Sequence, residues 1–241
     1  FFKMSFKIQA LQRIKRKIQI DAVLDVGVNT HTPELISSFP DIQHYLYEID
    51  PTYNEVIKKN YSSLSYSLSN VGLSDKNGSK YINSFSIHGT NQITHTVIRD
   101  KPINEHKGMP IIQSKEVEIK RLDQLDDSFP TRCLLKIDVD GTDLNVFKGA
   151  ENSIESIAVV IIESTTNKLL ETIATVSSHS FFLADMADII YYGDSIYQMD
   201  LIFIHSQFKH LFVENIHPFK PNQWKHYLAK NGAIQQNNPS K

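Results

Sequence analysis

Short apolar runs alternate with stretches of helical spacing along most of the chain. Apolar runs rich in branched side chains predict strands at 22–27, 44–50, 64–75, 132–139 and 156–164. Helical spacing predicts helices at about 33–39, 53–60, 144–150 and 167–177. This alternation is typical of βαβ units, in which helices join parallel strands. It predicts an open α/β sheet with helices on its faces.

The last apolar segment has a different pattern. Residues 186–205 form two apolar runs around Gly193-Asp194, a turn sequence typical of antiparallel hairpins. Weaker alternation predicts further strands at 79–87 and 117–123. We therefore expect one doubly wound α/β domain over 21–213, whose sheet has about seven strands, is mostly parallel and ends in a C-terminal antiparallel hairpin.

One long segment inside this domain lacks either pattern. Residues 88–110 are polar, rich in Ser, Thr, Asn and His, and show no helical period. Loops of this length are uncommon inside compact domains, and those that occur are often lids or binding loops. We expect a lid or loop insertion here, with a surface excursion as the alternative.

The two ends of the chain are polar or basic. Residues 1–20 are expected to form a helix whose bases, Lys7 and Arg13 among them, predict a solvated face; a partner-binding basic helix is the alternative. Residues 214–241 are expected to form a polar tail with a helix-like segment at 224–230.

Composition narrows the class of protein only modestly. The chain has 241 residues, 41% of them apolar and 22% charged, as in ordinary globular proteins. A formal net charge of −2 gives no reason to expect nucleic acid or an anionic membrane as partner. The single cysteine, Cys133, excludes an intrachain disulfide and indicates a reducing, cytoplasmic location. No apolar run reaches the ~18 residues of a membrane span.

The first two strands end in residues that could hold a nucleoside-type ligand. Gly27 lets the backbone turn sharply after the first strand, and the amides that follow could cradle a polar group. Asp25 could accept a hydrogen bond from an ammonium group. The second strand ends with Glu48 and Asp50, roughly 20 residues further on, where an acidic side chain can grip a ribose diol.

Several motifs in this order resemble the FkbM family of S-adenosylmethionine-dependent methyltransferases. They are "VLDVGVN" (23–29), "EIDP" (48–51), "GLSDKNG" (72–78), "RLDQL" (121–125) and "LLKIDVDGTDLNVFKGA" (134–150), of which the last is the most specific. The resemblance runs from about Asp21 to Ser206. It implies a class I methyltransferase-like, Rossmann-like fold and S-adenosylmethionine as cofactor.

The resemblance also implies roles for individual residues. The side chains and backbone of Asp25, Gly27 and Asn29 would line the methionine end of the cofactor. The ribose would be held by Asp50, and the adenine would be flanked by Asn70 and Val71. The transferred methyl would face Asp138. Family members commonly have glycine where this chain has His31, whose bulk would crowd the cofactor.

The acceptor side offers three candidate catalytic residues. Asp138 ends the fourth strand, and Glu163 ends the next, so the two carboxylates are adjacent if the strands are neighbours. They could share a divalent cation, one could act as a base with a raised pKa, or both could merely bind helix N-termini. His88, like His95, lies in the polar segment, from which a lid could deliver it as a base.

Together these features predict an S-adenosylmethionine-dependent O-methyltransferase. The acceptor would be a hydroxyl on a glycan, sugar or other small metabolite rather than a nucleic acid. The alternative is a non-catalytic nucleoside-binding or interaction module that keeps the fold, and His31 is the feature that favours it. The need for a divalent metal and the oligomeric state stay open.

Overall fold

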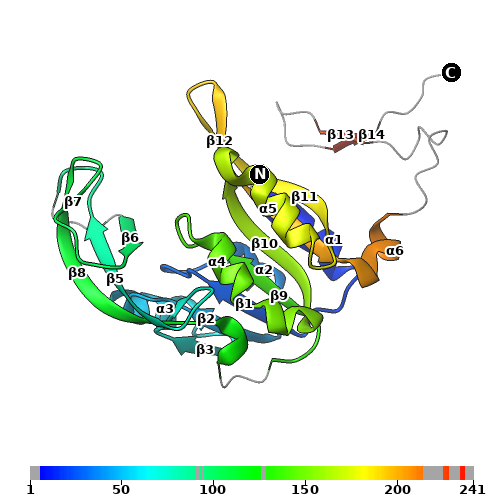
Figure 1. Ribbon diagram of the computed structural model, residues 1–241. Coiled ribbons are helices and arrows are strands. Elements are labelled where there is room, and N and C mark those ends of the chain that lie inside the picture. Colours follow the sequence, from blue (N-terminus) through cyan, green and yellow to red (C-terminus); the bar gives the residue numbers. More distant parts are fainter. Residues whose placement is uncertain are drawn as a thin grey trace.

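The chain folds around one twisted sheet with helices on both faces (Figure 1). The computed structural model describes residues 6–90, 93, 95–125 and 129–213, and the backbone of 225–227 and 234–236. Within these residues, none of the helices is both long enough and apolar enough to cross a bilayer.

The main sheet has seven strands in the order β11-β12-β10-β9-β1-β2-β3. Their bounds are β1 Ala22–Val26, β2 Gln43–Tyr47, β3 Tyr66–Ser69, β9 Cys133–Ile137, β10 Ile157–Thr165, β11 Phe181–Tyr192 and β12 Ser195–His205. All neighbours are parallel except β12, which is antiparallel to β10 and β11. The predicted mostly parallel α/β sheet with a C-terminal hairpin is therefore confirmed.

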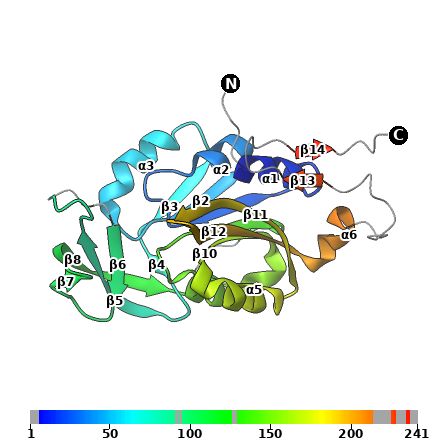
Figure 2. The same cartoon turned by 90° about the horizontal axis from the view of Figure 1, so that it is seen from above.

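Helices cover both faces of this sheet, as Figure 2 shows for α1, α2 and α3 on one side and α5 on the other. The α-helices are α1 Phe6–Lys15, α2 Pro33–Ser38, α3 Asn54–Asn60, α4 Asp143–Lys148, α5 Leu169–Ser177 and α6 Lys209–Phe212. Short 3-10 turns are η1 Pro51–Tyr53, η2 Leu122–Gln124, η3 Glu151–Ser156, η4 Thr166–Lys168 and η5 Ser206–Phe208. Alternate strand residues point to opposite faces, so Val23 packs with the α1 and α2 layer and Leu24 with the α4 layer.

A second, smaller sheet projects from the main one, and we call it the arm (residues 72–120; Figures 1 and 2). Its strands are β4 Gly72–Leu73, β5 Gly78–Phe85, β6 His95–Arg99 and β8 Met109–Lys120, in the order β4-β8-β5-β6; β7 Glu105–His106 pairs with β8. The strands predicted at 79–87 and 117–123 therefore belong to the arm, and the segment 64–75 is divided between the two sheets.

The expectation of a loop over 88–110 is corrected, because the arm strands β6 and β7 and the start of β8 lie in that segment. Antiparallel partners supply its backbone hydrogen bonds, and polar cross-strand pairs such as Ser84 with Thr96 (3.2 Å between hydroxyl oxygens) replace an apolar pattern. A strand with polar side chains on its exposed face gives no hydrophobic period. Whether the segment acts as a lid stays a prediction.

The ends of the chain also differ from expectation. Among the described residues the N-terminal helix covers Phe6–Lys15, so it ends before residue 20, and it buries Ala10, Leu11 and Ile14. In place of a helix at 224–230 there is the short strand β13 Lys225–Tyr227, which pairs antiparallel with β14 Ile234–Gln236. Apolar spacing in so short a segment fits a strand as well as a helix. The rest of the predicted tail lies outside the described residues.

Candidate active site

A cavity of about 300 Å³ lies at the carboxyl ends of β1, β2 and β9, where open α/β sheets bind ligands. Its wall includes five of the residues predicted from the sequence to hold a cofactor, namely Gly27, Asn29, Asp50, Val71 and Asp138. The opposite wall comes from β6 of the arm. The main sheet and the arm thus enclose the cavity together.

The turn after β1 requires glycine. Gly27 has a φ of +80°, and a Cβ on it would lie 1.9 Å from the carbonyl oxygen of Asp138. This close approach joins the ends of β1 and β9, since the Asp138 amide also donates to the Val26 carbonyl at 3.1 Å. Only a residue without a Cβ allows the ends of β1 and β9 to approach this closely.

Glu48 fastens this turn to the end of β2. Its Oε2 accepts a hydrogen bond from the Asn29 amide at 2.7 Å, and its Oε1 accepts one from the Asp50 amide at 2.9 Å. Burial raises the pKa of Glu48, although the two amides act in the opposite direction. Both carboxylate oxygens of Glu48 therefore serve the backbone.

Asp50, the second acid at the end of β2, has a different task. Its Oδ1 accepts from the Thr52 amide at 3.0 Å and so caps η1, and the residue lines the cavity. Capping of this kind fixes the carboxylate at the cavity wall.

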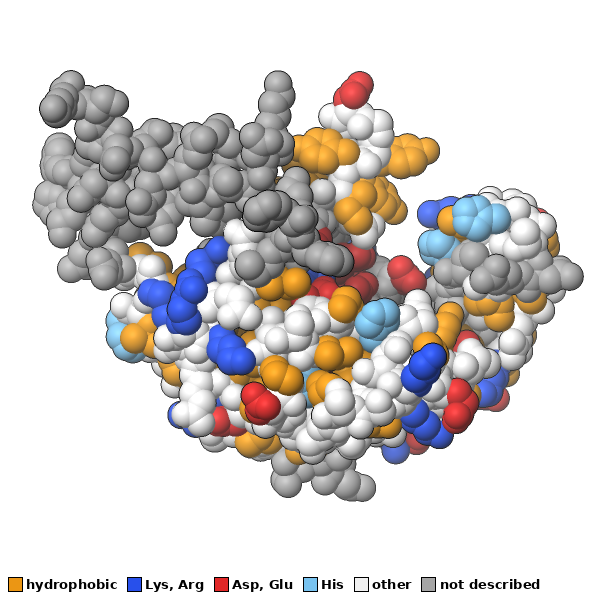
Figure 3. Space-filling model, turned by 180° about the vertical axis from the view of Figure 1, so that it is seen from behind, with side chains coloured by type: hydrophobic (Ala, Val, Ile, Leu, Met, Phe, Trp, Pro, Cys, Tyr) orange, Lys and Arg blue, Asp and Glu red, His pale blue; other side chains and the backbone are white. Residues whose placement is uncertain are grey.

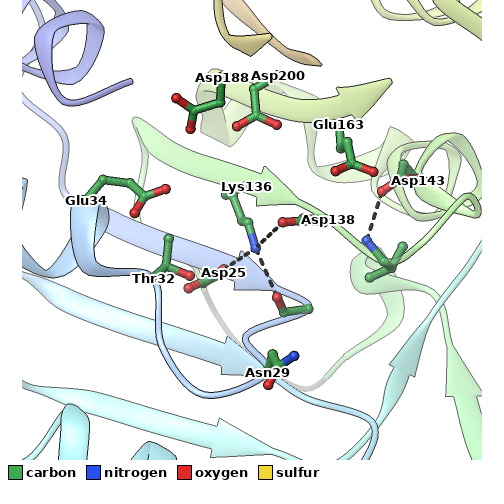
Figure 4. Close-up of polar contacts among 12 residues, drawn as sticks. Asp25, Asn29, Thr32, Glu34, Lys136, Asp138, Asp143, Glu163, Asp188 and Asp200 are labelled. Carbon is green, nitrogen blue, oxygen red and sulfur yellow. Dashed lines mark hydrogen bonds and ion pairs between the residues drawn. The ribbon is translucent and has the colours of Figure 1, made fainter. Parts of the chain in front are cut away.

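Asp25 lies beneath the cavity, although the resemblance implied that it would line the methionine end. It is fully buried, accepts a hydrogen bond from the Tyr61 hydroxyl at 3.2 Å, and lies 3.3 Å from the Nζ of Lys136. The same Nζ is 3.4 Å from Asp138 Oδ2 and donates to the Gly27 carbonyl at 3.0 Å (Figure 4). Burial alone would lower the pKa of Lys136, but the two carboxylates raise it, so the ammonium stays charged. This buried group supports the glycine turn from below.

Two residues expected near the adenine are placed differently from each other. Val71 lines the cavity. Asn70 instead donates through Nδ2 to the Glu48 carbonyl at 2.9 Å and exchanges side-chain hydrogen bonds with Asn54 at 2.8 and 2.9 Å. It therefore ties the end of β3 to the end of β2 and to α3.

Acidic side chains follow one another across the next strands of the sheet. The β9–β10 pairing extends to Ile137 opposite Ile162, so Asp138 and Glu163 come next on neighbouring strands, as expected. Glu163 is in turn paired with Asp200 of β12. We call Asp138, Glu163 and Asp200 the acidic row (Figure 4). Figure 3 shows acidic side chains in the hollow between the arm and the projecting end of the β11–β12 hairpin.

Glu163 is the most perturbed carboxyl of the row. Burial raises its pKa to about 8, and the carboxylates of Asp138, Asp143 and Asp200 contribute in the same direction. The side-chain amide of Gln198 donates to its Oε2 at 2.7 Å. A carboxyl whose pKa lies near neutrality can exchange protons at physiological pH.

Asp143 keeps the loop after β9 in place. Its Oδ1 accepts from the Val139 amide at 2.9 Å and its Oδ2 from the Gly141 amide at 3.0 Å. Asp143 therefore binds amides of the loop that precedes α4, and the alternative that Asp138 and Glu163 merely bind helix N-termini stays open. Asp138 differs from Asp143, because its side chain is 42% exposed and reaches Lys136.

Lys7 is buried, so its assignment to a solvated helix face is corrected. Lys7 of α1 is 8% exposed, and its Nζ lies 2.5 Å from Asp200, 2.7 Å from Glu34 and 3.0 Å from Asp188. The available signal was its helical spacing, because Lys7 stands three and four residues before the buried Ala10 and Leu11. Its long apolar stem can follow that face while the ammonium reaches the acids.

The histidines are also arranged differently from expectation. His88 does not line the cavity, whereas His95, the first residue of β6, does. His31 is exposed, lies 3.1 Å from the Thr30 hydroxyl through Nδ1, and is absent from the cavity wall, so it does not crowd the site. Within the described part of the chain, no group of three or more His, Cys, Asp or Glu side chains is arranged to hold a metal ion.

Comparison with known proteins places this geometry in a family. The model of the methyltransferase FkbM domain matches residues 21–191, most of the chain. Similar solved structures include a TehB-like SAM-dependent methyltransferase from Corynebacterium glutamicum, with 9% identity, 81% of this chain and 86% of that chain covered, and a TM-score of 0.41. A putative RNA methyltransferase from Pyrococcus horikoshii has 11% identity, coverages of 83% and 82%, and a TM-score of 0.45.

A further similar structure is the 23S rRNA methyltransferase ErmE, with 10% identity, 85% of this chain and 70% of that chain covered, and a TM-score of 0.46. No curated protein matches the chain significantly. The family match over 21–191 agrees with the motifs and with the strand order described above. The chain therefore belongs to the FkbM family of S-adenosylmethionine-dependent methyltransferases.

Proposed function

We propose that this methyltransferase transfers a methyl group from S-adenosylmethionine to a hydroxyl oxygen of a sugar or another small metabolite. The observation that carries the proposal is the place of Glu163 next to Asp138 on the neighbouring strand, where burial raises its pKa to about 8. A hydroxyl must lose its proton as its oxygen attacks the methyl group. A base with a pKa near the working pH is best suited to take that proton.

The cavity suits the parts of S-adenosylmethionine. Gly27 and Asn29 line the cavity at the end of β1 and would lie beside the methionine end. Asp50 would hold the ribose: its Oδ1 is used by the Thr52 amide, which leaves Oδ2 for a hydroxyl donor. Val71 would pack against the adenine. The bound cofactor supplies a methyl group on a positively charged sulfur.

The acceptor would lie over the acidic row. Asp138 lines the cavity and belongs to the row, so it would stand beside the transferred methyl and help to orient the acceptor hydroxyl. Glu163, on the neighbouring strand, would take the proton. Holding the two reactants in line near ~3 Å supplies much of the rate acceleration in such displacements.

The charge of the row supports a neutral acceptor. Lys7 and Lys136 are already bound to carboxylates, so the hollow presents acidic side chains to an incoming molecule. Such a surface attracts hydroxyl groups and repels phosphates. We therefore propose that nucleic acid is not the acceptor.

The test measures release of S-adenosylhomocysteine from S-adenosylmethionine with neutral oligosaccharides and with an RNA oligonucleotide as separate acceptors. We expect turnover with an oligosaccharide and none with RNA. Glu163→Gln should lower turnover by about 10²–10⁴, as the loss of a general base does. The exposed Glu171→Gln on α5 is the matched control and should retain activity. Turnover on RNA alone, or full activity of Glu163→Gln, would refute the proposal.

A further inference from the structure

The arm contributes one complete wall of the cofactor cavity. Leu73 of β4 and Thr96 and Ile98 of β6 line the cavity, and these strands are the two opposite edges of the arm sheet. The sheet must therefore curve so that both edges reach the same site (Figure 2). An appendage without a role in binding would not need to present both edges there.

His95 stands at the rim of this wall and is held by packing. It is paired with Phe85 in the β5–β6 register, and the two rings stack with centroids 5.8 Å apart and an interplanar angle of 28°. Phe85 is 4% exposed and also contacts the ring of His106, with centroids 5.2 Å apart. The position of the His95 ring is thus set by a buried aromatic side chain.

Across the cavity from the arm lies the loop after β9. Burial and the neighbouring Asp138 raise the pKa of Asp140, and a positive charge on His95 lowers it, so the two side chains influence each other across the cavity. The titratable groups around His95 are the following: Glu48, Asp50, Tyr53, Asp138 and Asp140 along the cavity wall, and His106 behind Phe85. The wall opposite the arm is therefore anionic.

We propose that His95 is a binding residue for S-adenosylmethionine and closes the cavity over the cofactor from the arm. The inference rests on the proposed use of the cavity as the cofactor site. His95 and Asp140 both line the cavity, so the imidazole would pack beside the bound cofactor.

The test is calorimetric titration of the full chain with S-adenosylhomocysteine. His95→Ala should weaken binding about tenfold, which corresponds to roughly 1.4 kcal/mol. His106→Ala is the matched control, because His106 also packs on Phe85 but does not line the cavity, and it should bind within about twofold of the parent. Equal affinity of His95→Ala and the parent would overturn the inference.

A second pair of variants tests whether a loss of affinity comes from the cavity wall or from a general change in the arm. Ile98→Ala, which enlarges the cavity wall, should weaken binding, and the adjacent Val97→Ala, outside the wall, should not. An equal loss of affinity in both variants would overturn the inference. Failure of the parent to bind S-adenosylhomocysteine would instead refute the proposed function.

Discussion

At the carboxyl end of the main sheet, the β1–β2 side and the β9–β12 side use their acidic side chains in opposite ways. At the β1–β2 side, Glu48 gives both oxygens to backbone amides and Asp25 is neutralised by Lys136. At the β9–β12 side, Asp138 and Asp200 crowd Glu163 and, together with burial, leave it with a pKa of about 8. The first side is fixed by satisfied hydrogen bonds, and the second keeps a carboxyl ready to exchange a proton. The proposed function assigns the cofactor to the first side and the acceptor to the second, and these roles need such different arrangements.

The largest effect should come from the turn on the rigid side. Gly27→Ala places a Cβ 1.9 Å from the Asp138 carbonyl in a residue with φ +80°, so the ends of β1 and β9 must separate. We expect a loss of more than about 4 kcal/mol of unfolding free energy, or failure to fold, and no cofactor binding. Gly193→Ala, with φ +60° and open space around it, should lose only about 1 kcal/mol. Equal losses in denaturant unfolding would show that the close approach is unimportant.

The next effect comes from the cation that links the two sides. Lys136→Met leaves Asp25 buried without its cation, and we expect a loss of about 3 kcal/mol in unfolding free energy. The control is Lys58→Met, whose exposed pair with Glu55 should contribute little to the free energy of unfolding. Comparable stability of Lys136→Met and the parent in urea unfolding would mean that the buried pair does not support the turn.

A smaller effect is expected on the β9–β12 side, where the free energy of unfolding should depend on pH through Glu163. Because the folded-state pKa of Glu163 is raised from 4.5 to about 8, its contribution to stability is complete below about pH 4.5 and is lost as the pH rises towards 8. Glu163→Gln should therefore be more stable than the parent at pH 9 by about 1–2 kcal/mol, less than the full linkage value because the carboxyl is partly exposed. At pH 5 the two should unfold at similar urea concentrations. A constant difference between pH 5 and pH 9 would contradict the raised pKa.

The smallest expected effect concerns Asp50, the residue assigned to the ribose of the cofactor. Asp50→Asn keeps the shape of the side chain but removes its charge, and should weaken S-adenosylhomocysteine binding about tenfold in calorimetry. The exposed Asp41→Asn is the control and should bind normally. Unchanged affinity of Asp50→Asn would remove Asp50 from the cofactor site.

Sequence patterns predicted the main sheet well because its central strands β1, β9 and β10 are buried on both faces and read as continuous apolar runs. The same reasoning missed β6, since its side chains are polar or partly exposed and its hydrogen bonds come from a partner ten or more residues away. Motifs placed Gly27, Asp50 and Asp138 at the cavity, as residues that follow strands. They could not show that Asp25 lies below it, because that depends on Lys136 and Tyr61, which are distant in the sequence.

The role of Lys7 depended on packing that no local pattern contains. A lysine near apolar positions of a helix is usually solvated, and only the approach of α1 to α2 and β12 brings its ammonium to Glu34 and Asp200. Similarly, the choice between His88 and His95 depends on the register of β5 and β6. Both placements are determined by contacts between secondary-structure elements and not by the elements themselves.

We propose that the β1–β2 side is a preformed cofactor site. Calorimetric titration of the full chain with S-adenosylhomocysteine near pH 7.5 measures this binding directly. We expect one site per chain with a dissociation constant on the order of micromolar. No detectable binding at millimolar ligand would contradict it.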